Sequence, residues 1–251
     1  MNSAYHRHVA SPSGLGNSTT RQLRSMVPML LVPVGSTEQH GPHLPLDTDT
    51  RIATAVADGV VERMAEEFGA PGDRRVVVAP AVGYGASGEH QGFTGTISIG
   101  TAALELLLVE YGRSASNWAG RIVFVNGHGG NVAALAAAVA LLRYEGRDVG
   151  WVPCSVPDAD AHAGHTETSV LLHISPGDVL TDELVCGNTS ALSELMPRMR
   201  SGGIGAVSEL GILGDPTTAT AAEGERIFAE MVNGCADRIK RWQPDRNGLL
   251  T

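Results

Sequence analysis

The chain reads Met29-Leu30-Leu31-Val32-Pro33-Val34 and then Gly35-Ser-Thr-Glu-Gln-His-Gly-Pro-His-Leu-Pro-Leu-Asp-Thr-Asp49, an apolar run followed by a polar loop. The apolar run is typical of a buried β-strand. The loop concentrates carboxylates and imidazoles: Glu38, His40 and Asp49 are its candidate ligands, and His43 and Asp47 are expected to orient them. Oxygen and nitrogen donors held at the exit of a rigid strand are what a divalent metal needs. This stretch therefore predicts a metal-binding loop at the end of a strand.

Two further polar clusters occur along the chain. Asn126-Gly-His-Gly-Gly-Asn131 follows a second apolar run, and His162-Ala-Gly-His-Thr-Glu-Thr-Ser169 supplies two more histidines and a glutamate. Each cluster has a structural alternative: His128 could stabilise the fold only, and Glu167 could favour a helix N-terminus. Glycines on both sides of His128 allow close backbone approach, which favours a ligand. Because the carboxyl ends of parallel strands share one edge of a sheet, we expect the clusters to converge there.

Apolar periodicity predicts strands and helices in alternation. Strands are expected at 28–35, 76–79, 96–99, 121–125 and 148–153. Helices are expected at 48–68, from a capping Thr101 onward, at 131–144, at 166–173 and at 217–242. This alternation indicates a three-layer α/β/α sandwich with a mostly parallel sheet, formed by one domain at 27–251. Residues 1–26, rich in Ser, Gly, His and Arg, are predicted to form a flexible N-terminal arm.

The composition restricts the class of protein. A chain of 251 residues can bury one sizeable core, and a net charge of −9 argues against binding nucleic acid or an anionic membrane. The three cysteines are far apart and form no Cys-x-x-Cys pair, which favours a reduced compartment. No apolar stretch is long enough to span a bilayer, and no signal peptide is recognisable. We therefore expect a cytoplasmic protein.

The segment Gly83-Tyr-Gly-Ala-Ser-Gly88 matches the G-x-G-x-x-G pattern of dinucleotide-binding proteins. That pattern also requires a helix whose N-terminus faces a pyrophosphate. The residues that follow are too rich in glycine and charge to form such a helix, so a nucleotide site is not expected. A shaped loop beside a pocket is the better interpretation, with Tyr84, Glu89 and His90 as candidate substrate contacts.

Several blocks together resemble the signature of the creatininase family. These are Glu38-x-His40 with Asp49, Asn126-Gly-His128, His162-Ala-Gly-x-x-Glu167-Thr-Ser, the Tyr84–Ser98 region and Gly214-Asp-Pro216. The resemblance extends over roughly residues 28 to 230. It implies an α/β amidohydrolase with two adjacent divalent metals, assembled as a hexamer or another closed homo-oligomer. Family members open the creatinine ring, deformylate formamidopyrimidines, or cut a precursor peptide during mycofactocin maturation. Residues 1–7 and 38–50 resemble the last group most closely.

The resemblance also assigns roles to individual residues. Asp49 is expected to bridge two divalent ions, which are Zn, Fe, Mn or Co. Glu38 and His128 are expected to complete one site, and His40 and Glu167 the other. A shared carboxylate places two cations about 3.5–4 Å apart, close enough to activate one water. His162 matches the family histidine that transfers a proton, and a histidine titrates in the range that this task requires.

The chain departs from creatininase itself in ways that bear on the substrate. Gly129 and Gly130, two further candidate substrate contacts, stand where creatininase has a tyrosine and a glutamate, and the segment before His162 lacks a tryptophan. A pocket without aromatic walls offers a flat ring little to stack on, so a peptide-like amide is expected. A small cyclic amide or a formamide is the alternative substrate. A non-catalytic metal-binding scaffold for peptides is a further alternative, but such a scaffold has no need of His162.

Overall fold

A computed structural model describes residues 14–24, 26–68 and 76–251. Its sheet has four parallel strands in the order β2-β1-β3-β4. The strands are β1 (Met29–Val34), β2 (Val76–Val78), β3 (Arg121–Asn126) and β4 (Val149–Pro153). Each is an almost continuous apolar run, as expected for a parallel sheet that is covered on both faces.

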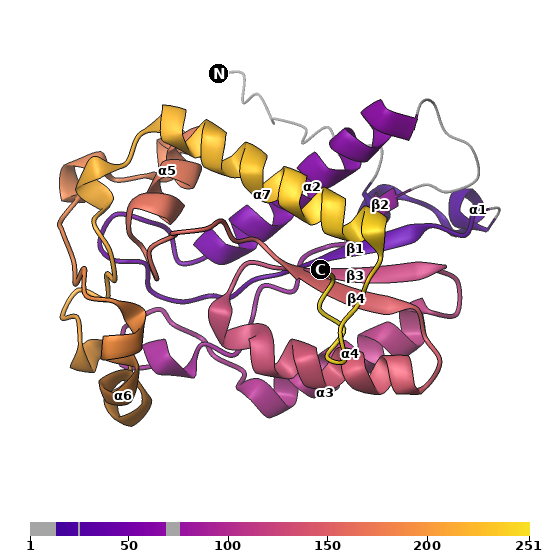
Figure 1. The fold of residues 1–251 in the computed structure, drawn as a ribbon, viewed down its shortest axis with the longest axis horizontal. Coiled ribbons are helices and arrows are strands. Elements are labelled where there is room, and N and C mark those ends of the chain that lie inside the picture. Colours follow the sequence, from indigo (N-terminus) through magenta and orange to yellow (C-terminus); the bar gives the residue numbers. More distant parts are fainter. Residues whose placement is uncertain (1–13, 25, 69–75) are drawn as a thin grey trace, which may run out of the picture.

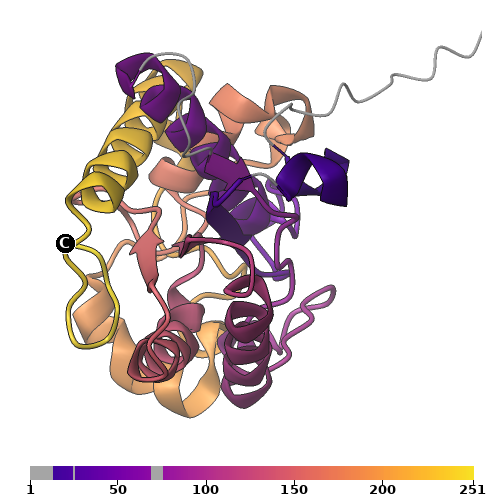
Figure 2. The ribbon, with the colours of Figure 1, turned by 90° about the vertical axis from the view of Figure 1, so that its right-hand side faces the viewer.

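Helices cover both faces of the sheet (Figures 1 and 2). One layer contains α2 (Thr48–Phe68), α5 (His165–Ile174) and α7 (Ala221–Arg241), and the other contains α3 (Thr101–Ala115) and α4 (Val132–Tyr144). Successive strand residues alternate between the layers: Leu31 and Val123 pack under the first, and Leu30 and Phe124 under the second. The predicted three-layer α/β/α sandwich is confirmed.

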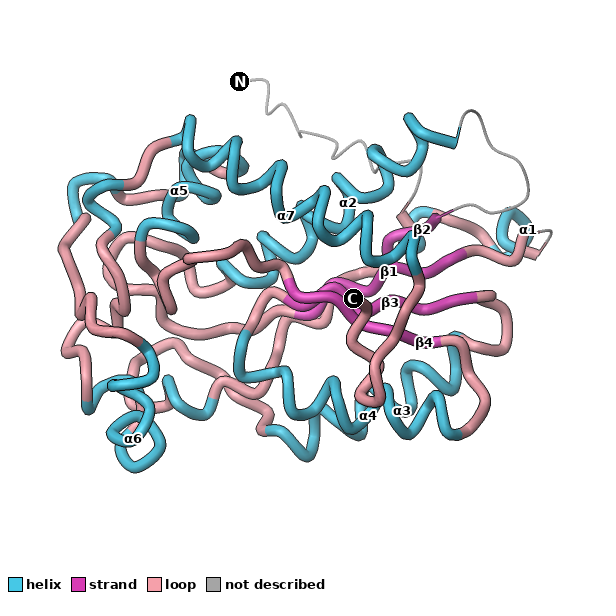
Figure 3. Tube along the Cα trace, viewed as in Figure 1, coloured by secondary structure: helices cyan, strands magenta, loops and turns pink. Residues whose placement is uncertain are grey.

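Loops and short helices extend beyond one end of the sheet (Figure 3). They include α6 (Leu192–Gly202), which the sequence did not predict and which contains Pro197. Single turns of 3₁₀-helix occur at Leu15–Asn17, Gly88–His90, Gly129–Asn131, Pro176–Asp178, Thr181–Glu183, Ile204–Ala206 and Pro216–Thr218. Within the described ranges, no helix combines the length and apolar character needed to cross a membrane.

Three predicted elements differ from the structure. The strand expected at 96–99 is absent, because Ile97 and Ile99 donate single backbone hydrogen bonds to two different loops. Gly100, not Thr101, is the N-cap of α3. The last helix begins at Ala221 and not at 217, because the Thr220 side chain caps it and a separate 3₁₀ turn precedes it.

The predicted N-terminal arm at 1–26 lies partly outside the described residues. Within the described part, α1 (Thr20–Leu23) begins with a capping box between Thr19 and Gln22. Gly14 forms an isolated parallel bridge with Val78 of β2. This part of the predicted arm therefore contacts the edge of the sheet.

Candidate metal centre

The predicted ligands come from four different segments that meet at the carboxyl ends of the strands. Glu38 and His40 lie in the loop after β1, Asp49 in the first turn of α2, His128 directly after β3, and Glu167 in the first turn of α5. The first four are buried and Glu167 is partly buried. The register of β1 against β3 aligns Val34 with Asn126, so both loops leave the sheet at the same level.

The ligands form two groups that share Asp49. In one group, Nδ1 of His128 lies 3.3 Å from Oε1 of Glu38 and 3.2 Å from Oδ2 of Asp49. In the other, Nε2 of His40 lies 3.1 Å from Oδ1 of Asp49 and 3.8 Å from Oε2 of Glu167. Each group brings three potential ligand atoms within 4.8 Å of one another. The two oxygens of Asp49 thus face different groups, which is the arrangement that a bridging carboxylate requires.

The hydrogen bonding of the first group shows that these residues suit a cation. Both side-chain oxygens of Glu38 and Nε2 of His128 are buried without a hydrogen-bond partner among the described residues. Burial raises the pKa of Glu38 to about 8. A buried carboxylate without a partner is costly, and a divalent ion would remove that cost. Mixed carboxylate and imidazole donors suit Zn, Mn, Fe or Co.

The remaining candidate ligands also have displaced pKa values. Burial opposes a charge on His40, but the nearby carboxylate of Asp49 outweighs it and raises the pKa of His40 to about 10. Burial also opposes a charge on Asp49, yet His40 and His128 hold its pKa well below the usual range. Burial raises the pKa of Glu167 to about 7. Protons on these groups thus balance part of the negative charge that a bound cation would neutralise.

Neighbouring groups orient the ligands. Ser36 donates a hydrogen bond of 2.6 Å to Oδ2 of Asp49. Oε1 of Glu89 lies 3.5 Å from Nε2 of His128, on the side of the ring away from Asp49. A carboxylate there can fix the orientation of a metal-binding imidazole. The predicted substrate contact Glu89 therefore also lies where it can orient His128.

Glycines make this close approach possible. A Cβ on Gly127 would lie 2.4 Å from the backbone oxygen of Asp49. A Cβ on Gly130 would lie 2.5 Å from Nε2 of His128 and 2.4 Å from the backbone oxygen of Ala86. Any larger residue at these two positions requires the backbone or the imidazole to move.

His162, the predicted proton-transfer residue, is buried beside both groups. Its Nε2 lies 2.8 Å from the backbone oxygen of Gln39, so we assign the ring proton to that nitrogen. The other nitrogen, Nδ1, lies 3.7 Å from Oε1 of Glu38. Burial, together with the neighbouring His40, lowers the pKa of His162 well below its usual range. His162 also lies close enough to Glu38 and His40 to form a third possible ligand group.

A cavity of about 380 Å³ opens onto the two groups. Of the predicted substrate contacts, it is lined by Glu89, His90, Gly129 and Gly130. Tyr84 is half exposed and is not among the lining residues. The apolar lining of the cavity consists of Leu192, Met196, Met199, Ile204 and Leu213, and Arg200 also lines it.

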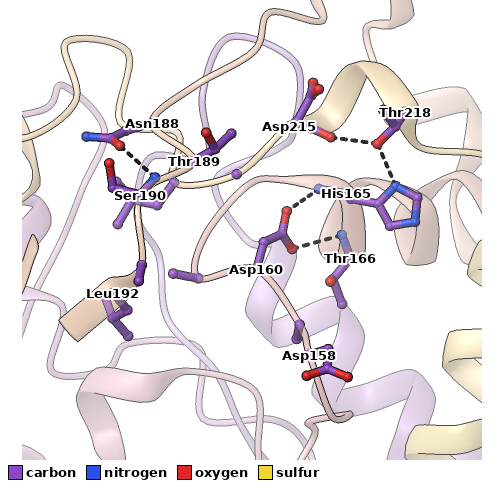
Figure 4. Close-up of a pocket in the computed structure, with 15 residues that line it drawn as sticks. Asp158, Asp160, His165, Thr166, Asn188, Thr189, Ser190, Leu192, Asp215 and Thr218 are labelled. Carbon is purple, nitrogen blue, oxygen red and sulfur yellow. Dashed lines mark hydrogen bonds between the residues drawn. The ribbon is translucent and has the colours of Figure 1, made fainter. Parts of the chain in front are cut away.

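Figure 4 shows the lining of a second cavity, of about 690 Å³, that shares residues with the first. Ala161, Leu192 and Leu213 line both cavities. His165 belongs to this second cavity, where its Nδ1 lies 2.8 Å from Oγ1 of Thr218. It therefore lines the neighbouring space and not the cavity that opens onto the candidate ligands.

Comparisons with known proteins show the family of this chain. A model of the creatininase family, described as creatinine amidohydrolase, matches residues 17–239. The chain belongs to the creatininase family. A family member named mycofactocin precursor peptide peptidase, from Mycolicibacterium smegmatis, is 87% identical over 251 residues, with both chains covered in full. A Mycobacterium tuberculosis (H37Rv) protein of the same name is 63% identical over 251 residues, again with full coverage. The creatinine amidohydrolase of Pseudomonas putida is 29% identical over 86% of this chain and 90% of that one.

Solved creatininase structures share the fold. One named "Creatininase Mn" superimposes with a TM-score of 0.73 at 27% identity, covering 93% of this chain and 99% of that one. A mutant creatininase of Zn–Zn type gives a TM-score of 0.74 at 26% identity, with the same coverage. The family thus binds divalent metals, and the described residues of this chain contain candidate ligand groups.

Sequence reasoning missed several residues at this creatininase-family site. Gln39 contacts His90, His162 and Gly211 through its side chain, and its place between Glu38 and His40 was a signal that could have found it. Ser36 could have been found in the same way, since it lies in the loop that carries Glu38 and His40. Met196, Met199 and Arg200 belong to no motif, because a helix separated from the ligands in sequence supplies them.

Proposed function

We propose that this chain is a dinuclear metal-dependent peptidase of mycofactocin biosynthesis. Its reaction would cleave an amide bond near the C-terminus of a modified precursor peptide. The observation that carries this proposal is the pair of three-residue groups that share Asp49 beside a cavity. It is supported by full-length relatives named mycofactocin precursor peptide peptidase. Hydrolysis of an amide bond is the chemistry that the wider family name also describes.

The proposed cofactor is a pair of divalent ions, drawn from Zn, Fe, Mn or Co. Glu38, Asp49 and His128 would hold one ion, and His40, Asp49 and Glu167 the other. Such ions, when bound, polarise a carbonyl oxygen and acidify water. Structures named for Mn and for Zn within the family support this choice of metals.

The proposed task of His162 is to move a proton. With the proton on Nε2 held by the Gln39 carbonyl, Nδ1 is the nitrogen that can accept one. The low pKa of His162 keeps the ring neutral at rest, so it releases an accepted proton readily to a leaving amine. An amine that leaves without a proton is a poor leaving group, so this step lowers the barrier to cleavage.

A peptide suits the cavity better than creatinine does. Neither Gly129 nor Gly130 carries a side chain to enclose a small ring, and none of the described lining residues is Phe, Tyr or Trp. The adjoining second cavity offers space for a longer chain. Hydrolysis of a small cyclic amide or a formamide is the second candidate function. The relative from Pseudomonas putida, named creatinine amidohydrolase, supports it. A peptide scaffold without activity is a third candidate, against which the position of His162 argues.

We also propose that the protein is a cytoplasmic homo-oligomer, a hexamer or another closed assembly. The family precedent supports the assembly. Cys154, Cys186 and Cys235 are free thiols, as a reducing compartment favours. Light scattering at micromolar concentration tests the assembly, and a single 26.2 kDa species would contradict it.

The activity is tested with metal-loaded protein, a mycofactocin-type precursor peptide and creatinine, with products weighed by mass spectrometry. We expect a C-terminal fragment from the peptide and almost no change in creatinine. His162→Ala should lower kcat by about 10²–10⁴-fold and retain its metal, because proton transfer and not metal binding is its proposed task. His173→Ala is the matched control, since that exposed residue packs on Phe228 away from the centre.

Two outcomes would contradict the proposal. Rapid hydrolysis of creatinine without cleavage of the peptide would favour the small-amide hydrolase. Equal turnover by the parent and His162→Ala would show that another group transfers the proton, even with the family and the reaction unchanged.

A further inference from the structure

The side-chain amide of Gln39 lies between two histidines that line the cavity. Gln39 is buried and stands between the candidate ligands Glu38 and His40. Its Oε1 accepts a hydrogen bond of 2.9 Å from the backbone N–H of Gly41, and its Nε2 donates one of 3.1 Å to the backbone oxygen of Gly211. Exchange of the amide nitrogen and oxygen would place donor against donor and acceptor against acceptor. The two backbone groups therefore fix the orientation of the amide.

The second hydrogen of this amide can go to only one of the two histidine rings. Nε2 of Gln39 lies 2.9 Å from Nδ1 of His90 and 3.1 Å from Nε2 of His162. Nε2 of His162 already donates its hydrogen to the backbone oxygen of Gln39 at 2.8 Å, so it cannot accept another. The amide hydrogen therefore goes to Nδ1 of His90. A ring that accepts at Nδ1 carries its single proton on Nε2.

The two rings thus present opposite hydrogen-bonding groups to the same place. Nδ1 of His162 lies 3.7 Å, and Nε2 of His90 lies 3.3 Å, from Oε1 of Glu38. The ring centroids are 4.4 Å apart, and both residues line the cavity that opens onto the ligand groups. Nδ1 of His162 can only accept a hydrogen, whereas Nε2–H of His90 can only donate one. That N–H forms no hydrogen bond with any described residue, so it is available to an oxygen atom in the cavity.

We propose that His90 is a catalytic hydrogen-bond donor whose Nε2–H binds the oxygen of the scissile carbonyl, and that Gln39 holds the ring in the tautomer that this requires. The proposal rests on the peptidase function proposed above and adds a residue to it. When an amide is attacked, its carbonyl oxygen gains negative charge, and an N–H already held in place stabilises that charge. His90 is only 2% exposed, so water competes little with such a hydrogen bond. The two histidines then have separate tasks, because His162 is left to move the proton.

The tautomer is tested by NMR in the metal-free and the zinc-loaded protein, because zinc has a filled d shell and is diamagnetic. Long-range proton–nitrogen correlation of ring-labelled histidines shows which nitrogen of each ring carries the proton, and the signals of His90 are those that vanish in His90→Gln. We expect His90 to be protonated on Nε2. Gln39→Glu should move that proton to Nδ1, because a carboxylate accepts where the amide donated. Gln39→Met is the control: it has a similar size and no N–H, so it should impose neither tautomer.

The hydrogen bond to the substrate is tested by turnover of the precursor peptide. His90→Ala should lower kcat by about 10²–10³-fold and change KM little, because the lost interaction forms mainly in the transition state. His90→Gln should recover much of this loss, since the amide nitrogen of glutamine can take the place of Nε2–H. His90→Asn is its matched control: the shorter amide can replace only Nδ1, so this variant should stay as slow as His90→Ala.

Two further measurements separate this role from a structural one. All the His90 variants should keep the metal content of the parent, because a protonated Nε2 is not a metal ligand. Gln39→Glu should lower kcat with His90 still in place, because it turns the donor away from the substrate. His173→Ala, on the surface, should match the parent in kcat and metal content.

Distinct results would overturn each part. A proton on Nδ1 of His90 in the parent would show that the tautomer is assigned wrongly. Equal kcat for the parent and His90→Asn would remove the donor role, and loss of an ion from the His90 variants would make His90 a ligand instead. If the metal-loaded parent cuts no precursor peptide, the proposed peptidase function fails and the donor role falls with it, whereas the tautomer assignment is still decided by NMR alone.

Discussion

The two groups of candidate ligands share Asp49 but are supported in different ways. In the second group, His40 donates from Nδ1 to the backbone oxygen of Glu38 at 3.1 Å, and Glu167 accepts from the backbone N–H of Ala163 at 2.6 Å. In the first group, the side-chain carboxylate of Glu38 has no hydrogen-bond partner among the described residues. The backbone thus orients the second group in advance, whereas the first group depends on a cation for its charge balance.

The largest expected effect follows from the residue that the groups share. Asp49→Ala should remove both ions, so that metal content falls from about two per chain to near zero and peptide cleavage is lost. Elemental analysis after gel filtration measures this. The matched control is Asp47→Ala, which removes a half-exposed carboxylate that pairs with Arg51 instead. A full metal complement in Asp49→Ala would show that the groups do not share this ligand.

A smaller effect separates the two groups. Glu38→Gln and Glu167→Gln should each retain about one ion per chain, with the damaged site weakened by more than about 100-fold. The ion that remains in Glu38→Gln should be the tighter one, because the backbone orients His40 and Glu167. Metal titration by calorimetry compares the two variants. Tighter residual binding in Glu167→Gln would reverse the comparison.

The smallest effect is a dependence on pH. In the metal-free protein, burial raises the pKa of Glu38 to about 8, above its unfolded value. Protonation of Glu38 therefore favours the folded metal-free protein, and this contribution to stability is lost as pH rises through about 8. A cation requires the carboxylate, so the stabilisation by metal should grow as pH rises toward 8. For each proton that the metal displaces, the apparent affinity for the metal should rise about tenfold per pH unit. Thermal unfolding with and without metal measures this, and a gain that shrinks with rising pH would contradict it.

The sequence predicted the sheet and the ligands because their signals are local. Apolar runs such as Ile122–Val125 identify buried strands, and a polar residue directly after such a run lies at the sheet edge. His128 could be placed in this way, and Asp49 by its position at the end of the polar loop that follows the first strand. The strand expected at 96–99 was wrong because β-branched residues also occur in extended loops that make isolated hydrogen bonds.

The remaining parts depend on contacts between distant segments. Leu192, Leu195, Met196 and Met199 recur at helical spacing in α6, so the sequence offered a signal for this helix despite Pro197, but no local signal marked it as the wall of a cavity. The contact of Gln39 with His90 and His162 joins residues far apart in sequence. Likewise, the position of Glu89 beside His128 follows only from the folding of its loop. The sequence predicted which residues are polar, and the fold decides which of them meet.

Gly130 has a consequence for how activities within this family can interconvert. Creatininase resembles this chain but has a glutamate at the corresponding position. Here even a Cβ would lie 2.4 Å from the backbone oxygen of Ala86 and 2.8 Å from Oε1 of Glu89. A single substitution at Gly130 would therefore damage the centre before it could add a carboxylate. A carboxylate at this position therefore requires the Ala86–Glu89 loop to move as well, and substitution of Gly130 alone cannot supply it.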